Sequence, residues 1–93
     1  MSRHVPRRER WQRRGPGEYR SADGLTVRYE KRAWWAEVAY TLLLPAPSPE
    51  GLPAAEPHHD RLGPFRRPRN AMVEAERHAT LLRNRHGERV RFG

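Results

Sequence analysis

The run from Ala33 to Leu44 constrains the fold most, because it is the longest apolar stretch and holds two of the three tryptophans. A helix is one interpretation, since periodicity alone does not settle the structure of a short apolar run. Its aromatic and β-branched residues, with turn signals on both sides, favour a β-strand. We therefore expect the central strand of a small sheet, with alternate side chains on opposite faces. One face would carry Trp34, Ala36, Val38, Tyr40 and Leu42.

Two shorter strands are expected before the central one. Residues 18–22 form the first, with Tyr19 facing inward, and Leu25, Val27 and Tyr29 line one face of the second, over residues 25–30. Asp23-Gly24 between them is typical of a type I′ hairpin turn, which needs positive φ at both central residues. Lys31-Arg32 makes the next tight connection.

A single helix is expected near the C-terminus. Pro68 suits a first helical turn, and Gly87 suits a C-cap. Apolar residues recur between them at helical spacing, and the alanines among them would let the helix lie close to the sheet. They are Ala71, Met72, Ala75, Ala79 and Leu82. The predicted fold class is α+β, a small three-stranded antiparallel sheet packed by one C-terminal helix.

The chain is long enough for one domain, which we expect at residues 17–87 with the order β-β-β-α. Residues 1–16 would be a disordered basic tail, and residues 88–93 a basic C-terminal tail. Five prolines predict an extended, disordered insert at residues 45–61. Trp11 has two interpretations: it stacks on a nucleic-acid base, or it folds back onto the small core.

The chain has a formal net charge of +8, and Lys31 is the single lysine among 19 basic residues. A GC-rich genome explains the preference for arginine over lysine, but it explains the net charge less well. Arginine is suited to phosphate by its planar, bidentate donors, so the charge favours nucleic-acid binding. The candidate nucleic-acid-binding residues are Arg7, Arg8, Arg13, Arg14, Arg20, Arg28, Arg32, Trp35, Arg66, Arg67 and Arg69.

Signals for catalysis or cofactors are weak. The absence of cysteine excludes disulfides and thiolate metal sites, and no glycine-rich phosphate loop follows a strand. His58-His59-Asp60, even with His78 and His86, has the composition of a metal site but not the spacing. We expect no enzyme activity, no cofactor and no metal. No apolar run is long enough to span a membrane, and no apolar segment follows the basic N-terminus, so we expect a cytoplasmic protein without membrane contact.

The order of elements resembles the β-β-β-α DNA-binding domain at the N-terminus of phage tyrosine integrases, which is similar to the AP2 family of plant DNA-binding domains. The matching pieces are Gly17-Glu18-Tyr19-Arg20, Asp23-Gly24, Trp34-Trp35-Ala36-Glu37-Val38, Leu62-Gly63-Pro64-Phe65 and the helix over residues 69–82. The resemblance covers roughly residues 17–85. It implies a sheet that enters the major groove with the helix behind it. It does not imply recombination, because it does not extend to a catalytic domain.

Two functional hypotheses follow. The first is a small non-enzymatic nucleic-acid-binding accessory protein, phage- or plasmid-like, that contacts DNA rather than RNA. Sheet residues would face the groove and tail arginines would contact phosphates. The second is a protein-interaction module, an inhibitor or an adaptor, that binds an acidic protein partner. The two differ in how steeply binding depends on salt.

Overall fold

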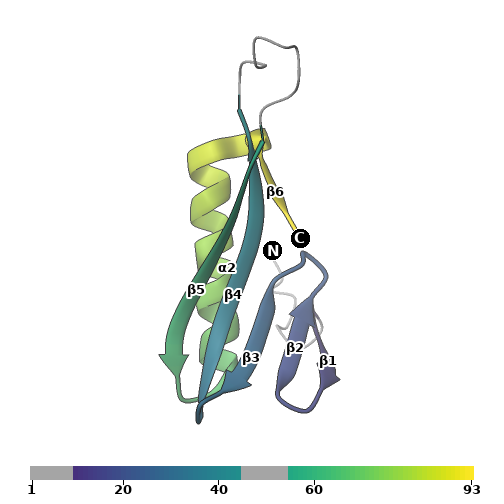
Figure 1. Ribbon diagram of the computed structural model, residues 1–93, viewed down its shortest axis with the longest axis vertical. Coiled ribbons are helices and arrows are strands. Elements are labelled where there is room, and N and C mark those ends of the chain that lie inside the picture. The colour runs from purple at the N-terminus through teal and green to yellow at the C-terminus, as the bar shows by residue number, and fades with distance from the viewer. Residues whose placement is uncertain (1–9, 45–54) are drawn as a thin grey trace, which may run out of the picture.

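The computed structural model describes residues 10–44 and 55–93, which form one antiparallel sheet and one long helix (Figure 1). In chain order the elements are β1 (Trp11–Gly15), β2 (Glu18–Ser21), β3 (Thr26–Glu30), β4 (Ala33–Leu43), β5 (Ala55–Phe65), α2 (Pro68–His86), the 3-10 helix η1 (Gly87–Arg89) and β6 (Val90–Phe92). The predicted α+β class, with an antiparallel sheet and one C-terminal helix, is confirmed. The predicted number of strands is wrong.

The sheet has six strands within the described residues, where the sequence predicted three. Its order is β1-β2-β3-β4-β5, and β6 pairs with β4 on the side that β3 also occupies. β3 pairs with the first half of β4, up to Glu37, and β6 pairs with Tyr40 to Leu42. The segment predicted as a basic C-terminal tail therefore contributes a short strand. The long β4 forms ladders along both of its edges, and so it is the centre of the sheet.

β1 lies in the segment that the sequence predicted as a disordered tail. Trp11 explains the difference, because its side chain is buried in the core and its Nε1 donates a 2.8 Å hydrogen bond to Oε2 of Glu76 on α2. The interpretation of Trp11 as a core residue is thus correct, and stacking on a base is excluded for the free protein. The rest of the predicted tail, residues 1–9, lies outside the described residues.

β5 overlaps the predicted proline-rich insert at residues 45–61. It pairs with β4 from Trp34 to Leu43, and so provides hydrogen-bond partners for backbone groups along an edge of β4 that would otherwise be unpaired. β5 is itself an edge strand, where proline is tolerated. Pro57 therefore does not prevent pairing, and the prediction of an irregular loop is wrong for residues 55–61. Residues 45–54 lie outside the described part of the chain.

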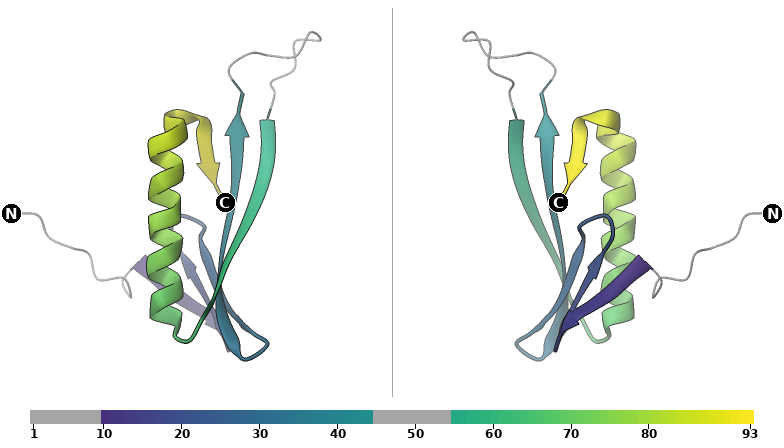
Figure 2. Two further views of the ribbon diagram at one scale, coloured as in Figure 1. Left: turned by 90° about the vertical axis from the view of Figure 1, so that its left-hand side faces the viewer. Right: turned by 90° about the vertical axis from the view of Figure 1, so that its right-hand side faces the viewer.

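The helix α2 covers one face of the sheet, as two side views show (Figure 2). The predicted face of β4 is the one in the core, where Ala36 and Val38 are fully buried and Tyr40 is nearly so. The predicted stripe of the helix is confirmed, since its buried residues are those expected from the spacing, Ala71, Met72, Ala75, Ala79 and Leu82. Small side chains on both surfaces let the helix and the sheet pack closely.

The type I′ turn does not occur in the hairpin where the sequence predicted it. At Asp23-Gly24 only Gly24 has positive φ, at 87°, so this turn is not type I′. The two positive φ values of a type I′ turn occur at Lys31 and Arg32, at 52° and 64°. Two long basic residues thus hold a left-handed conformation that glycine or asparagine adopts more easily.

We expect Trp11→Ala to lower the free energy of unfolding by about 3–4 kcal/mol, because a buried aromatic residue and its hydrogen bond are lost. Arg14→Ala on the same strand removes an exposed side chain and should change stability by about 0.5 kcal/mol or less. Urea unfolding followed by circular dichroism measures both variants. Equal stability of the two variants would show that β1 is not part of the cooperative core.

Candidate nucleic-acid interface

The open face of the sheet, the face turned away from α2, carries several of the predicted site residues. The register places Arg20 on β2, Arg28 on β3 and Trp35 on β4 on this face. Among the described residues no element covers it (Figure 2). The resemblance to integrase domains implies a DNA contact on this face. Whether the face would attract phosphate depends on the charges of its side chains.

Glu37 lies at the centre of the open face and draws basic side chains toward itself. Its carboxylate is 3.9 Å from Nε of Arg28, 3.7 Å from Nε of Arg61 and 3.8 Å from Nε2 of His59. The Glu37 side chain is only 15% exposed, which limits screening by water. Glu18 approaches Arg28 from β2 at 4.0 Å. The positive charges of Arg28 and Arg61 are therefore matched within the sheet.

Trp35, the predicted stacking residue, is also engaged. The guanidinium of Arg61 lies over its ring, 4.5 Å from the centroid, and its Nε1 donates a 3.1 Å hydrogen bond to the backbone oxygen of Glu30. A Cβ added at Gly63 would lie 3.0 Å from its Cε3, so β5 packs against the ring as well. One ring surface and the only polar group of Trp35 are thus already used within the protein.

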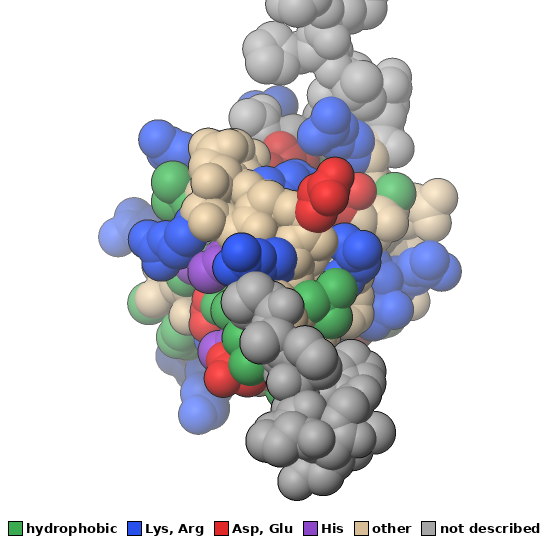
Figure 3. Space-filling view, turned by 90° about the horizontal axis from the view of Figure 1, so that it is seen from above, with side chains coloured by type: hydrophobic (Ala, Val, Ile, Leu, Met, Phe, Trp, Pro, Cys, Tyr) green, Lys and Arg blue, Asp and Glu red, His purple; other side chains and the backbone are tan. Residues whose placement is uncertain are grey.

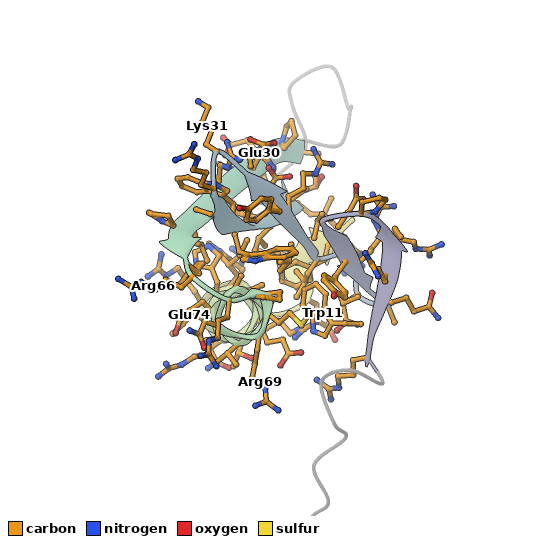
Figure 4. The ribbon with its side chains drawn as sticks, turned by 90° about the horizontal axis from the view of Figure 1, so that it is seen from below. Trp11, Glu30, Lys31, Arg66, Arg69 and Glu74 are labelled. Carbon is orange, nitrogen blue, oxygen red and sulfur yellow. The ribbon has the colours of Figure 1, made fainter. Side chains whose placement is uncertain are left out.

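A second group of cations gathers at one end of the molecule, where the β1–β2 turn, the β3–β4 turn and the β5–α2 connection all lie (Figure 1). We call this group the basic end. It consists of Arg13, Arg14, Lys31, Arg32, Arg66, Arg67 and Arg69. In a view onto this end, the side chains of Lys31, Arg66 and Arg69 point outward from the body of the protein (Figure 4). Six of the predicted site residues thus come together here.

The basic end differs from the open face because its cations are not held in ion pairs, although the charge of Lys31 also acts on the neighbouring Glu30. Among the described residues, none of its seven side chains forms an ion pair. The start of α2 adds to the positive potential, because its first turn contains no acidic residue and the N-cap Arg67 makes no side-chain cap. All seven cations are exposed to solvent. This end can therefore attract an anion without first breaking internal ion pairs.

The remaining predicted site residues have other positions. Arg7 and Arg8 lie outside the described residues. Arg20 is exposed on the outer part of the open face and forms no ion pair within the described residues. Lys31 was not among the predicted nucleic-acid-binding residues, although the sequence places it in a tight turn beside Arg32. The glutamates that pair with Arg28 and Arg61 were not predicted either, because the alternation of apolar and polar residues does not give the strand register that brings them together.

The histidine and aspartate residues do not gather into a metal site. His59 lies on the open face, and Asp60, its neighbour on β5, faces α2 and contacts Nε2 of His78 at 2.7 Å. No group of three metal-ligating side chains occurs in residues 10–44 and 55–93. Burial, and then the negative charge of Asp60, raises the pKa of Tyr40. These residues join the helix to β4 and β5 on the covered side of the sheet.

At the end opposite to the basic end, the described residues mix charges of both signs (Figure 3). Seen from above, basic side chains lie around the periphery of the molecule, with acidic side chains and histidines among them (Figure 3). Arg83 near this end pairs with Asp23 at 3.8 Å and stacks on Phe92. Arg85, Arg89 and Arg91 near this end also form no ion pair within the described residues, but seven such cations lie at the basic end.

No match was found when the chain was compared with protein-family models, with curated proteins and with solved structures. The resemblance to the integrase domain consequently stays a prediction. The part of the chain that the structure describes contains no helix long and apolar enough to cross a membrane.

The ion pair between Arg61 and Glu30 yields a prediction about titration. Nη2 of Arg61 donates a 2.6 Å hydrogen bond to Oε1 of Glu30, which lowers the pKa of Glu30 below its ordinary value of 4.5. A carboxylate with a lowered folded-state pKa stabilises the fold above its unfolded pKa, and this contribution is lost as the pH falls through the folded value. We expect Arg61→Gln to return the pKa of Glu30 toward 4.5.

Carbon-13 NMR titration of the Glu30 carboxyl group below pH 5 or so measures this shift. Arg77→Gln is the matched control, because Arg77 pairs with Glu74 on the helix surface and does not contact Glu30. The expected result is an unchanged Glu30 curve in the control. A Glu30 curve that stays where it is in Arg61→Gln would contradict the assigned cause.

Proposed function

We propose that this chain is a small non-enzymatic nucleic-acid-binding protein that contacts phosphates with its basic end. The observation that supports the proposal most is the gathering of seven cations on or beside three connections at one end, none of which forms an ion pair within the described residues. The open face has similar arginines, but its glutamates match Arg28 and Arg61. Phosphates would meet cations that no ion pair holds within the described residues, with release of counterions as the main driving force.

The β3–β4 turn gives independent support. Lys31 and Arg32 both adopt positive φ, a conformation that costs about 1 kcal/mol or more for each residue with a side chain. Asn-Gly would form the same turn without this cost. Backbone strain that persists in a native protein commonly marks a functional position. Two cations thus stand in a strained turn, at a position where a phosphate contact would give the strain a function.

An acidic protein partner is the alternative, since carboxylates on another protein could also meet the basic end. Arg20, exposed on β2, would extend either contact. The two functions differ in salt dependence. Nucleic acid gives a steep linear loss of log affinity with log salt, about −0.9 per phosphate contact for a duplex and −0.7 for a single strand.

The turn provides a test that separates binding from folding. We expect the double variant Lys31→Asn/Arg32→Gly to gain about 2 kcal/mol of stability, because both positions then favour positive φ. The same variant should lose about 10-fold in affinity for nucleic acid at low salt, with a salt slope shallower by roughly 1.5. Urea unfolding and fluorescence anisotropy with labelled DNA measure the two effects.

The matched control is Arg85→Ala/Arg89→Ala at the far end of α2, which also reduces the formal net charge from +8 to +6. It should keep affinity within about 3-fold, because charges beyond a Debye length are screened. Equal losses in the two double variants would show that only net charge matters. No binding of the unaltered chain to DNA or RNA at low salt would reject the proposal and direct attention to a protein partner.

A further inference from the structure

Aromatic side chains line the sheet beside the basic end, on the face that α2 covers farther along. The register pairs Tyr29 on β3 with Trp34 on β4, and Trp34 in turn with Phe65 on β5. The three side chains therefore form one row across three strands, which we call the aromatic row. The ring centroids of Tyr29 and Trp34 are 5.2 Å apart, and Tyr19 approaches Trp34 from β2 at 5.8 Å.

The aromatic row lies at the level where α2 begins. His78 contacts Asp60, which is opposite Val38, so this helical residue marks the level of Val38. Trp34 is four residues earlier on β4, a distance of about 13 Å, which corresponds to roughly nine residues of α-helix. That count leads back to Arg69, in the first turn of α2. Only the first turn of α2 therefore lies level with the aromatic row. The rest of the helix covers the strands beyond it.

Tyr29 is the exposed member of the row. Its side chain is 49% exposed, although Val27, two residues earlier on the same face, is fully buried. Trp34 and Phe65 are partly buried and pack against the core. The position of Tyr29 is nevertheless well fixed, because its backbone nitrogen donates a 2.8 Å hydrogen bond to the oxygen of Gly17 and its ring contacts Trp34. A rigid ring with a solvent-exposed surface results.

The row is bordered by cations at both of its ends. Lys31 and Arg32 follow Tyr29 after one residue, and Arg66 and Arg67 follow Phe65 directly. The view from below shows Lys31 on one side of the molecule and Arg66 and Arg69 on another (Figure 4). An exposed ring between groups that bind phosphate is the arrangement by which proteins bind unpaired strands, since each base can stack while the backbone meets positive charge. A duplex keeps its bases stacked inside and cannot use such a ring.

We propose that the basic end binds single-stranded nucleic acid, with one unpaired base stacked on Tyr29 beside Trp34. This inference rests on the proposed function and adds the class of ligand to it. Exposed phosphates on any strand would meet the arginines, but only an unpaired base would reach the ring. Loss of the ring should therefore affect single strands with bases and spare every ligand that offers phosphates alone.

The test compares two labelled strands of about 10 nucleotides, oligothymidine and an abasic chain with the same number of phosphates. The unaltered protein should bind oligothymidine about 5- to 100-fold more tightly than the abasic chain. Tyr29→Ala should remove most of that difference and leave affinity for the abasic chain unchanged. Tyr29→Phe, which keeps the ring, should behave as the unaltered protein.

Two controls show whether a change in affinity comes from the loss of the Tyr29 ring. Alanine keeps the Cβ of Tyr29, which a Cβ added at Gly17 would meet at 3.1 Å, so the close approach of the two strands should be retained, and circular dichroism checks the fold. Leu81→Ala removes an exposed apolar side chain, 62% exposed, from the outer side of α2 and should leave both affinities unchanged. An RNA strand of uridines reports whether the sugar matters, and dependence on Tyr29 in either strand supports the proposal.

Equal affinity of the unaltered protein for oligothymidine and the abasic chain would overturn the inference. An equal loss of affinity for both strands in Tyr29→Ala would overturn it as well. Either result leaves the proposed function intact if binding to the abasic chain falls steeply with salt. Absence of binding to both strands and to duplex DNA at low salt would reject the proposed function together with the inference.

Discussion

The close packing of α2 on β4 is the interaction on which the rest of the structure depends. Ala36 on the strand and Ala71, Ala75 and Ala79 on the helix are all buried, and their small side chains let two backbones approach. The larger core side chains, Leu25, Val27 and Val38, fill the space beside this contact. A chain with so few apolar residues gains its stability from one well-covered face, and this leaves the other face and both ends for polar groups.

Some basic side chains of this protein are held in ion pairs and others, within the described residues, are not. On the open face, Glu37 holds Arg28 and Arg61 within the sheet, so a basic composition does not make that face basic in effect. At the basic end the arginines have no such partners among the described residues. Net charge alone is therefore a poor guide to the interface, and the position of the glutamates determines where a phosphate would be attracted.

The sequence predicted those features that depend on local patterns. Alternation identified the buried face of β4, and helical spacing identified the buried stripe of α2. It missed β1 and residues 55–61 of β5, because a basic segment and a proline-rich segment become strands only when Trp11 is buried in the core and β4 offers an edge. It also could not separate the open face from the basic end, since strand register brings Glu37 to Arg61 and Tyr29 to Trp34.

The shared edge of β4 has a consequence for the order in which the chain folds. β3 and β6 occupy successive parts of this edge, and Gly24, in the turn before β3, lies next to Gly93, just after β6. Short turns connect β1 to β4, whereas β5 and α2 separate β6 from β4 in the sequence, so we expect the pairing of β6 to carry a larger loop-closure cost and to form late. Few ladder pairs hold β6, so we also expect it to be among the strands that open first.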